Sequence, residues 1–333
     1  MNQSISDIDI TINPKDNRWQ SASGMVPVPL TNDYLFCAML QKNKFVLKSL
    51  ICSLLHLSTE EIKSVEITNP IELGDSLKEK TFILDIKVIM NSDTIVNLEM
   101  QVVNQHDWPE RSLVYLSRSF SKQLEKGSHY FSLKTAIHIS ILDFTLFPEY
   151  PEFFSTNYVM NQKTHKIYSD KFRLYVLCLT QINMATEEDK FYQIDTWARL
   201  FKCQDWRELQ MLAKTNQDIQ EAVSTIYQLT QDEKIRYQCE RRAEAIRREE
   251  SERYEKDVIL RQYQEATSEN GKLTIANRKL ASENEQLTSE NSQLTSENSQ
   301  LTSENSQLTS ENSQLTSENE RLRKLLAEYH INI

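Results

Sequence analysis

Hydrophobic residues recur every three or four positions in the first part of the chain, which is the spacing of one face of a helix. The pattern starts at Leu35 and reaches Leu55. Thr31 or Asn32 can cap this helix, because a short polar side chain accepts hydrogen bonds from the free N–H groups of the first turn. The sequence therefore predicts a helix that begins near residue 32 and packs on a core.

A different pattern follows, in which β-branched and aromatic residues dominate two short stretches. Thr81–Met90 and Thr94–Val102 are separated by Asn91–Asp93, three residues that favour a turn, so they predict a hairpin. Later patterns predict a helix with Pro109 in its first turn and Gly127 at its end, strands at Thr135–Phe144 and near Phe172–Gln181, and helices at about Ile194–Phe201 and Asp205–Leu229. This order predicts an α/β fold, a mixed sheet flanked by helices.

The last part of the chain repeats every seven residues. The unit T-S-E-N-S-Q-L occurs four times in succession over residues 288–315. Leucine therefore has the period of a left-handed coiled coil, at Leu273, Leu280, Leu287, Leu294, Leu301, Leu308, Leu315 and Leu322. Asparagine occupies the other position of the predicted seam, which weakens it. Two interpretations stay open: a marginal parallel dimer or trimer zipper, or a solvated low-complexity repeat.

These patterns divide the chain into four parts. We predict a disordered N-terminal segment at 1–24, a globular domain at 25–230 and a heptad-repeat tail at 263–333. Between the last two, residues 231–262 interleave acidic and basic side chains, which is typical of an exposed helix with i,i+4 ion pairs. This stretch predicts a charged helical stalk that leads into a long C-terminal helix or coiled coil.

Composition excludes several classes of protein. The chain has 4 glycines in 333 residues and no glycine-rich nucleotide-binding fingerprint. Its 5 cysteines form no C-x-x-C pair, which argues against a zinc site and a disulfide framework. No apolar run approaches the ~18 residues of a membrane span, and Met1–Asn17 is unlike a signal peptide. We therefore expect a cytoplasmic protein without a membrane partner.

Net charge at first argues against a nucleic-acid partner, because the chain carries −10. However, residues 263–320 hold ten acidic and three basic side chains, and so account for −7 of that charge. The rest of the chain is only mildly acidic. Charge therefore leaves a nucleic-acid partner open for the globular domain.

The candidate catalytic residues lie in the predicted hairpin. With Asn91–Asp93 as a three-residue loop, Asp85 lies directly opposite Glu99, with Cβ atoms about 4.5–5.5 Å apart. Two like charges at that distance destabilise a hairpin unless a cation lies between them. Lys87 and Gln101 point to the same face, since side chains alternate along a strand. Hard oxygen ligands with a neighbouring donor are the groups of a divalent-metal site that cleaves phosphodiesters.

An ordinary structural explanation stands beside this one. Asp85, Lys87 and Glu99 can be the wet face of an exposed hairpin, tied by a cross-strand ion pair. Spacing alone favours that explanation. Apolar residues on the opposite face can cover a core under either interpretation: Phe82, Leu84, Ile86, Val88, Val96, Leu98 and Met100.

A set of short segments extends beyond the hairpin in a fixed order. They are T-N-D-Y-L-F (31–36), K-T-F-I-L-D-I-K-V (80–88), I-V-N-L-E-M-Q (95–101), E-R-S-L-V-Y-L-S-R-S-F (110–120), Q-L-E-K-G-S-H-Y (123–130) and I-H-I-S-I-L-D-F (137–144). Together they resemble the PD-(D/E)XK nuclease family transposases, also called Rpn recombination-promoting nucleases. The resemblance implies a restriction-endonuclease-like fold and a DNA endonuclease that uses Mg²⁺ or Mn²⁺, linked to recombination or mobile elements.

The resemblance assigns roles by position. Asp85 matches the metal-binding Asp of the family, Glu99 matches its second carboxylate, and Gln101 lies where other branches of the superfamily have lysine. An amide can orient a water molecule but supplies no positive charge. We therefore expect Lys87 to supply part of that charge, which makes Asp85, Glu99, Gln101 and Lys87 the predicted catalytic set.

The predicted helix after the hairpin carries candidate DNA contacts. Arg111 and Tyr115 are one turn apart and match an Arg and a Tyr of the family, so they can contact a phosphate. Equally, Arg111 can pair with a surface acid while Tyr115 packs. Arg118 and Lys122, with Lys126, extend a basic edge that can follow a DNA backbone. A solvated helix face explains that edge nearly as well.

Three remaining residues carry mainly structural expectations. Asp33 matches a family Asp, and its expected role is to stabilise the N-terminus of the first helix. His129 and His138 lack metal-ligand spacing, so we expect surface or core histidines. No recognition helix or zinc module is visible, which predicts low sequence specificity. The alternative to an active nuclease is an inactive mobile-element remnant that acts in DNA binding or in coiled-coil oligomerisation.

Overall fold

The computed structural model describes residues 12–13, 16–69, 85–124, 127 and 129–328. The chain divides into two compact units, residues 1–250 and 251–333, each of which is described by itself. No helix of the described ranges is both long and apolar enough to cross a membrane.

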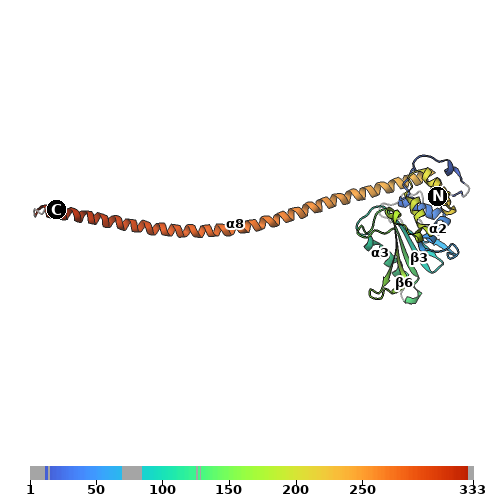
Figure 1. The fold of residues 1–333 in the computed structure, drawn as a ribbon, viewed down its shortest axis with the longest axis horizontal. Helices are drawn as coiled ribbons and strands as arrows, with labels where there is room; N and C mark the ends of the chain where they lie inside the picture. Colours follow the sequence, from blue (N-terminus) through green and yellow to red (C-terminus); the bar gives the residue numbers. More distant parts are fainter. Residues whose placement is uncertain (1–11, 14–15, 70–84, 125–126, 128, 329–333) are drawn as a thin grey trace, which may run out of the picture. The chain divides into compact units, whose positions relative to one another are not determined.

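A six-stranded sheet forms the centre of the first unit, in the order β1-β2-β3-β4-β6-β5 (Figure 1). Its strands are β1 Val65–Ile67, β2 Asp85–Met90, β3 Thr94–Gln101, β4 Thr135–Leu142, β5 Phe154–Met160 and β6 Ile167–Cys178. The β3–β4 and β4–β6 pairs are parallel, whereas the other neighbours are antiparallel. The predicted mixed sheet is thus confirmed. The three-residue β1 and the mostly exposed β5 were absent from the sequence prediction.

Helices and short 3-10 turns surround this sheet. They are η1 Arg18–Ser21, α1 Asp33–Lys42, α2 Lys44–Leu55, α3 Trp108–Ser121, η2 Tyr130–Ser132, η3 Leu179–Met184, α4 Glu187–Phe191, α5 Ile194–Lys202, α6 Trp206–Ala213 and α7 Gln217–Gln231. The single helix predicted to reach Leu55 is in fact two, because Asn43 leaves the helical conformation and its side chain caps α2. In the same way, Asn216 caps α7 and separates it from α6.

The two faces of the sheet have different cover. Ile86, Val88, Val96, Leu98 and Met100 are buried together with α1, α2, α5 and α7, as predicted for the apolar face. The predicted members Phe82 and Leu84 lie outside the described residues. On the other face, α3 packs on β4 and β6, and Trp108 joins a small buried cluster with Leu142, Val176 and Cys178. The helix that carries Arg111 therefore covers the face that carries Glu99.

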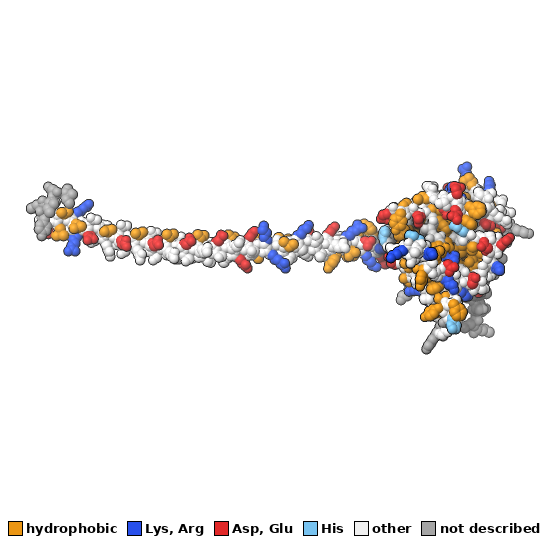
Figure 2. Space-filling model, turned by 60° about the horizontal axis from the view of Figure 1, so that its bottom comes forward, with side chains coloured by type: hydrophobic (Ala, Val, Ile, Leu, Met, Phe, Trp, Pro, Cys, Tyr) orange, Lys and Arg blue, Asp and Glu red, His pale blue; other side chains and the backbone are white. Residues whose placement is uncertain are grey.

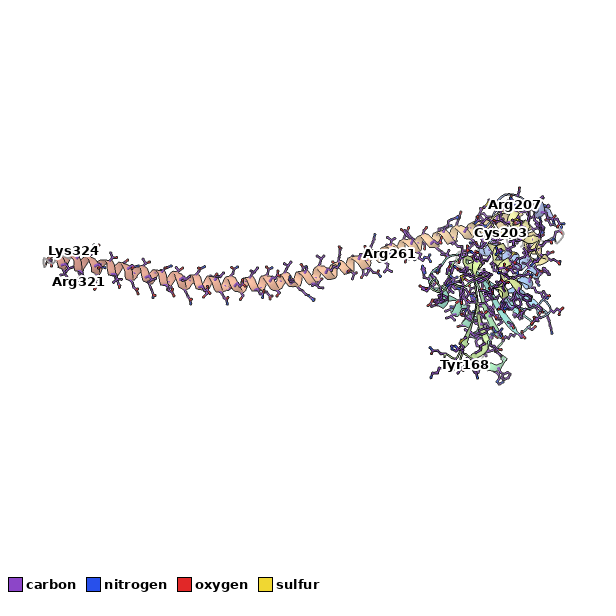
Figure 3. All side chains as sticks on the ribbon, in the orientation of Figure 1. Tyr168, Cys203, Arg207, Arg261, Arg321 and Lys324 are labelled. Carbon is purple, nitrogen blue, oxygen red and sulfur yellow. The ribbon has the colours of Figure 1, made fainter. Side chains whose placement is uncertain are left out.

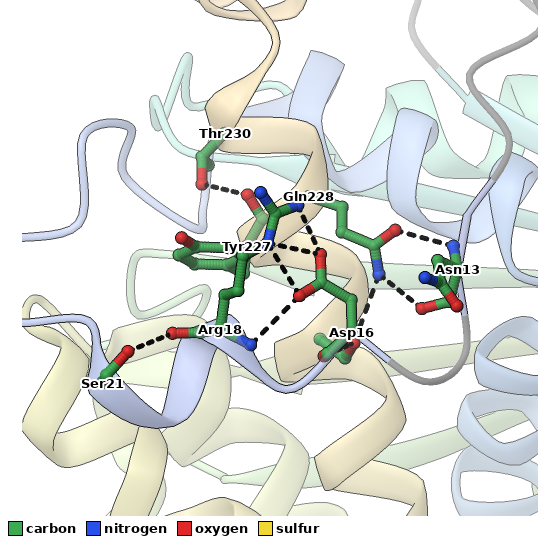
Figure 4. A network of polar contacts seen from close by, with 8 residues as sticks. Asn13, Asp16, Arg18, Ser21, Tyr227, Gln228 and Thr230 are labelled. Carbon is green, nitrogen blue, oxygen red and sulfur yellow. Dashed lines mark hydrogen bonds and ion pairs between the residues drawn. The ribbon is translucent and has the colours of Figure 1, made fainter.

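The described part of the N-terminal segment is held against α7 rather than disordered as we predicted for residues 1–24. Trp19 is 5% exposed and belongs to the core. Figure 4 shows the Arg18 guanidinium bonded to Asp16, with a closest distance of 2.7 Å. The same guanidinium lies 5.9 Å from the ring centroid of Tyr227. These contacts extend the domain to the N-terminal side of residue 25.

The long helix α8, Glu233–Glu328, begins inside the domain. Ile235 and Cys239 are buried in the core, and the Cys239 carbonyl accepts a hydrogen bond from the Asn32 side chain at 3.1 Å. Arg242 Nε donates to Asp33 Oδ2 at 2.7 Å, and both side chains are more than nine-tenths buried. The first turns of the predicted stalk are therefore part of the packed domain.

The second unit continues α8 through the heptads, so the helix predicted there is present. Its leucines are about half exposed in the single chain, between 51% and 59% from Leu273 to Leu322. Figure 2 shows hydrophobic and acidic side chains recurring along this helix. Threonine and serine hydroxyls donate to the carbonyl four residues earlier, as Thr288 does to Asn284 at 2.7 Å. Along the described part of this helix, the leucines thus form an apolar row that is about half exposed.

We predict that Arg242→Ala lowers the free energy of unfolding by about 3 kcal/mol, because it leaves the buried Asp33 carboxylate without its charged partner. Denaturation followed by tryptophan fluorescence measures this, since all 4 tryptophans lie in the domain. Arg248→Ala is the control, because Arg248 is 73% exposed in its ion pair on the same helix. Similar losses in the two variants would contradict the prediction.

Candidate active site

The observed hairpin has the predicted register. Asp85 pairs with Glu99 and Lys87 pairs with Asn97 across the β2–β3 ladder. Because side chains alternate along each strand, Asp85, Lys87, Glu99 and Gln101 all lie on the face that α3 covers. The geometric part of the prediction is therefore confirmed, and Asn97 is added to the same face.

Glu99 is a buried acid with one charged partner. Its side chain is 4% exposed, and Arg111 Nη2 donates to Glu99 Oε1 at 3.0 Å. Arg111 Nε also donates to the Tyr115 hydroxyl at 3.0 Å. The guanidinium lies 5.2 Å from the Trp108 ring centroid and 5.5 Å from that of Tyr115. Arg111 thus pairs with a buried acid of the site, which neither of the two sequence interpretations described.

Asp85 is held at the start of β2 by Asn69. The Asn69 amide donates to the backbone carbonyl of Asp85 at 3.0 Å and to Asp85 Oδ1 at 3.2 Å. Its carbonyl oxygen accepts from the Lys87 backbone N–H at 2.7 Å. Asn69 therefore fixes both the strand and its carboxylate. No signal in the sequence pointed to this residue, because it lies 16 positions before Asp85.

Burial raises the pKa of both carboxyl groups of the site. Burial raises the pKa of Glu99 to about 7, against the opposing effect of Arg111, and the neighbouring charges of Asp85 and Asp33 raise it further. Burial also raises the pKa of Asp85, while Lys87 acts in the opposite direction. Burial is the main cause of both raised pKa values, because it disfavours the charged form of each acid, and a bound cation would stabilise that charged form.

The donor set fits a hard divalent cation. Glu99 Oε2 is buried and has no hydrogen-bond partner among the described residues. Those residues contain no group of three or more His, Cys, Asp or Glu side chains placed to bind a metal. Mg²⁺ is usually held by one or two carboxylates with water and substrate phosphates as further ligands. Asp85 and Glu99 are sufficient for that mode of binding, so Mg²⁺ or Mn²⁺ stays a prediction with a suitable site.

A buried polar pair lies beside the carboxylates. Asn97 Nδ2 and His138 Nδ1 are 3.1 Å apart, and both side chains are buried. Burial and the charge of Arg111 lower the pKa of His138 to about 3, so the ring is neutral and Nδ1 accepts from the amide. Against the larger effect of burial, Asn97 also lowers the pKa of the Asp85 carboxyl group. Side chains alternate along a strand, so the position of Asn97 two residues before Glu99 was a sequence signal for the same face. The parallel β3–β4 register places His138 beside Asn97.

The other predicted residues spread over a larger surface. Gln101 ends β3, and its amide donates to the Val103 carbonyl at 3.1 Å. Lys87 is half-buried beside Asp85, whereas Arg118 and Lys122 are exposed further along α3. Lys126 lies outside the described residues. The structure therefore places the four predicted catalytic residues on one face of the β2–β3 ladder and joins Arg111 and Tyr115 to Glu99, whereas Arg118 and Lys122 lie further along α3.

Asp33 and His138, for which we expected structural roles, lie near the carboxylates. Asn32 caps α1, since its side chain accepts from the Leu35 backbone N–H. Asp33 lies in the first turn of α1, as expected, where its Oδ1 accepts from the Tyr34 backbone N–H at 2.9 Å. Its carboxylate also pairs with Arg242 and raises the pKa of Glu99. His138 is fully buried, which fits the expectation of a core histidine, and His129 is exposed.

Comparison with protein families identifies the domain. The model described as PD-(D/E)XK nuclease family transposase matches residues 30–255, more than half of the chain. The chain therefore belongs to this family. The match continues past residue 144, where the last of the resembling segments ends, and includes the first turns of α8 with Arg242. A second model, FAZ1, C-terminal, matches residues 267–301 and 288–322 of the heptad repeat. No curated protein and no solved structure matches the chain.

We predict that wild type loses stability relative to Glu99→Gln as the pH rises from about 4.5 to about 7 without divalent metal. Unfolded Glu99 releases its proton near its ordinary pKa of 4.5, but the folded protein keeps that proton until the pH approaches about 7. The folded state therefore binds more protons in this window, and its stability falls with rising pH. The difference should reach a few kcal/mol, at about 1.4 kcal/mol per pKa unit.

Thermal unfolding in EDTA at several pH values measures this difference. Glu110→Gln is the matched control, because Glu110 is an exposed acid in the first turn of α3. A constant gap between wild type and Glu99→Gln from pH 4.5 to 7 would contradict the raised pKa.

Proposed function

We propose that this protein is a metal-dependent DNA endonuclease of the recombination-promoting type. The observation that carries the proposal is the Asp85–Glu99 pair on adjacent strands, with a buried and unpartnered Glu99 oxygen, in a chain of a nuclease family. Metal-dependent phosphodiester hydrolysis uses cation ligands placed beside a group that orients water. Asp85 and Glu99 supply the first, and Gln101 at the end of the same strand supplies the second.

Each side chain of the site has a distinct task in the proposed reaction. A bound Mg²⁺ or Mn²⁺ would supply Lewis acidity toward the phosphate and toward water. Gln101 orients the attacking water by hydrogen bonding. Other branches of the superfamily have lysine at the position of Gln101, and Lys87 contributes part of the positive charge that this lysine supplies there. Arg111 holds Glu99 in position at 3.0 Å and limits the repulsion between the two acids. Asn69 holds the Asp85 carboxylate, and the amide of Asn97 is held by the neutral His138.

The remaining parts of the proposal concern the substrate and the cell. Arg118 and Lys122 are exposed along α3 and are suited to contacts with a DNA backbone, which carry no sequence information. Low sequence specificity follows from such contacts. We further propose a cytoplasmic location and a role in recombination, which are consistent with the family.

We also propose that the heptads join two or more chains. The row of half-exposed leucines in α8 has the period of a coiled-coil seam. Asparagine in the other seam position makes that association weak. Joining two chains brings two cleavage centres to one DNA molecule, which suits double-strand cleavage because each centre cuts one strand.

We predict that Asp85→Ala reduces Mg²⁺-dependent nicking of supercoiled plasmid by at least about a hundredfold, because it removes a ligand on which charge stabilisation depends. Asp93→Ala should cut like wild type, since Asp93 is an exposed acid in the turn of the same hairpin. Equal nicking by Asp85→Ala and wild type would contradict the nuclease. Absence of nicking by wild type with Mg²⁺ or Mn²⁺ would instead support the inactive remnant.

The plasmid-nicking assay also distinguishes the proposed roles of Gln101 and Lys87. Gln101→Ala and Lys87→Ala should each reduce nicking, with Lys87→Ala the smaller effect. If Lys87→Ala cuts as fast as wild type while Gln101→Ala is inactive, the proposed role of Lys87 is wrong.

We predict that a variant ending at residue 262 sediments as a monomer and still nicks plasmid, but yields less linear product than wild type. The full-length chain with Leu294, Leu301 and Leu308 changed to serine should behave in the same way, because both changes remove the apolar seam. Sedimentation velocity and gel analysis of the products measure these outcomes. A monomeric full-length chain would contradict the zipper, and loss of nicking on truncation would contradict an independent nuclease domain.

A further inference from the structure

The hairpin of β5 and β6 extends beyond the core and exposes large aromatic side chains. Burial along β6 changes from exposed at Ile167 to buried at Cys178. Figure 3 shows Tyr168 at the far end of this hairpin, and its side chain is 85% exposed. Tyr130 and Phe131 of η2 are 79% and 80% exposed. We use the name aromatic–basic tip for the following residues: Tyr130, Phe131, Lys163, Lys166 and Tyr168.

Polar contacts hold the two parts of the tip together. Lys171 Nζ donates to the backbone carbonyl of Leu133 at 2.7 Å and to that of Phe131 at 3.4 Å, which ties η2 to β6. The Phe131 ring stacks on His129 with a centroid distance of 5.1 Å. In the turn, Asn161 Oδ1 accepts from two backbone N–H groups, including that of Lys163 at 3.0 Å. The exposed rings therefore project from anchored backbone.

The charge of this region is opposite to that of the chain. Residues 129–134 and 154–173 contain five basic side chains and one acidic side chain, Asp170, whereas the whole chain carries −10. Exposed rings among lysines are the features of surfaces that bind single-stranded nucleic acid, in which bases stack on aromatic side chains and lysines contact phosphates. Paired bases are inaccessible to such stacking, so the complementary ligand is a single strand.

The tip lies at the opposite end of the sheet from the carboxylates. Strand registers align Glu99 with Ser140 and Ser140 with Val176. Tyr168 precedes Val176 by eight residues in β6, a distance of about 26 Å along a strand. The helix α3 follows the same direction, because Gln123 just beyond its end bonds to the backbone of Lys134, at 2.8 Å from the Lys134 N–H. Arg118 and Lys122 therefore lie between the carboxylates and the tip.

We propose that the aromatic–basic tip binds single-stranded DNA that flanks the site of cleavage. This inference rests on the proposed function and specifies its substrate as duplex DNA with an adjoining single-stranded segment. The duplex occupies the carboxylate site and the exposed edge of α3, and the unpaired strand continues to the tip, where its bases stack on Phe131 and Tyr168 while Lys163 and Lys166 contact its phosphates.

Binding of the full-length chain to labelled DNA in EDTA tests the proposal without cleavage. The probes are a blunt duplex and the same duplex with a single-stranded overhang of about ten nucleotides, enough to span the ~26 Å to the tip, in either polarity. Wild type should bind one overhang probe more tightly than the blunt probe. The double variant F131A and Y168A should lose about tenfold or more on that probe, because each stacked base contributes substantially. Its affinity for the blunt duplex should stay within about twofold, since paired bases do not reach the rings.

Two further variants separate aromatic from charged contacts. The double variant K163Q and K166Q should flatten the salt dependence of overhang binding, by about 0.7 in the logarithmic slope per lost phosphate contact. F191A is the matched control, because Phe191 is 77% exposed on α4. It should bind both probes like wild type.

Equal affinity of wild type for blunt and overhang probes would overturn the proposal, as would unchanged overhang binding by F131A and Y168A. If this double variant instead alters only the sedimentation of the chain, the tip is a contact between protein copies and the proposal fails. A failure of the proposed nuclease is recognised separately, because it appears as plasmid nicking that Asp85→Ala does not reduce.

Discussion

The buried contact between Glu99 and Arg111 is the constraint on which the site depends. A carboxylate that is 4% exposed loses most of its hydration, and a single guanidinium contact at 3.0 Å restores only part of that free energy. Arg111 must therefore be held rigidly, and Trp108 and Tyr115 flank its guanidinium on α3. The electrostatics of the site therefore depend on the packing of α3 on the sheet, because this packing positions Arg111 beside Glu99. The raised pKa of Glu99 shows that one arginine compensates the burial incompletely.

A second buried ion pair joins the same region to the long helix. Asp33 at the start of α1 meets Arg242 of α8 at 2.7 Å, and the Asp33 charge raises the pKa of Glu99. The first turns of α8 are thus electrostatically part of the domain, in agreement with a family match that extends to residue 255. Beyond residue 250 the helix forms a separate unit with an apolar row of its own. One continuous helix is therefore a component of the fold in its first turns, and beyond them it carries the half-exposed leucine row for which we propose association.

The sequence contained the hairpin register because a three-residue turn and strict alternation determine it locally. Asp85 opposite Glu99 and the apolar reverse face both follow from that rule. The hydrogen-bond partners of the two acids could not be predicted from the sequence, because Arg111 and Asn69 contact Glu99 and Asp85 only through the packing of separate elements. The helix that we predicted to be continuous to Leu55 shows a different limit, since the capping side chain of Asn43 outweighed the helical spacing around it. The strand β5 was missed because its hairpin leaves the core and loses the alternation that marks a half-buried strand.

Unsatisfied polar atoms are concentrated where the acids lie. In the described part of the chain, Asn97 Oδ1, Glu99 Oε2, His138 Nε2 and Ser140 Oγ are all buried without a hydrogen-bond partner. They occupy neighbouring positions of β3 and β4, since Asn97 pairs with His138 and Glu99 with Ser140. A fold selected for stability alone would fill such positions with apolar side chains, because each unpaired buried polar group costs about 1–3 kcal/mol. Local departures from packing rules that gather around two acids are expected at a functional site. The burial of Asn97 and Glu99 argues against a solvent-exposed polar face, which was the alternative that spacing alone favoured, and it suits the cation site that we propose.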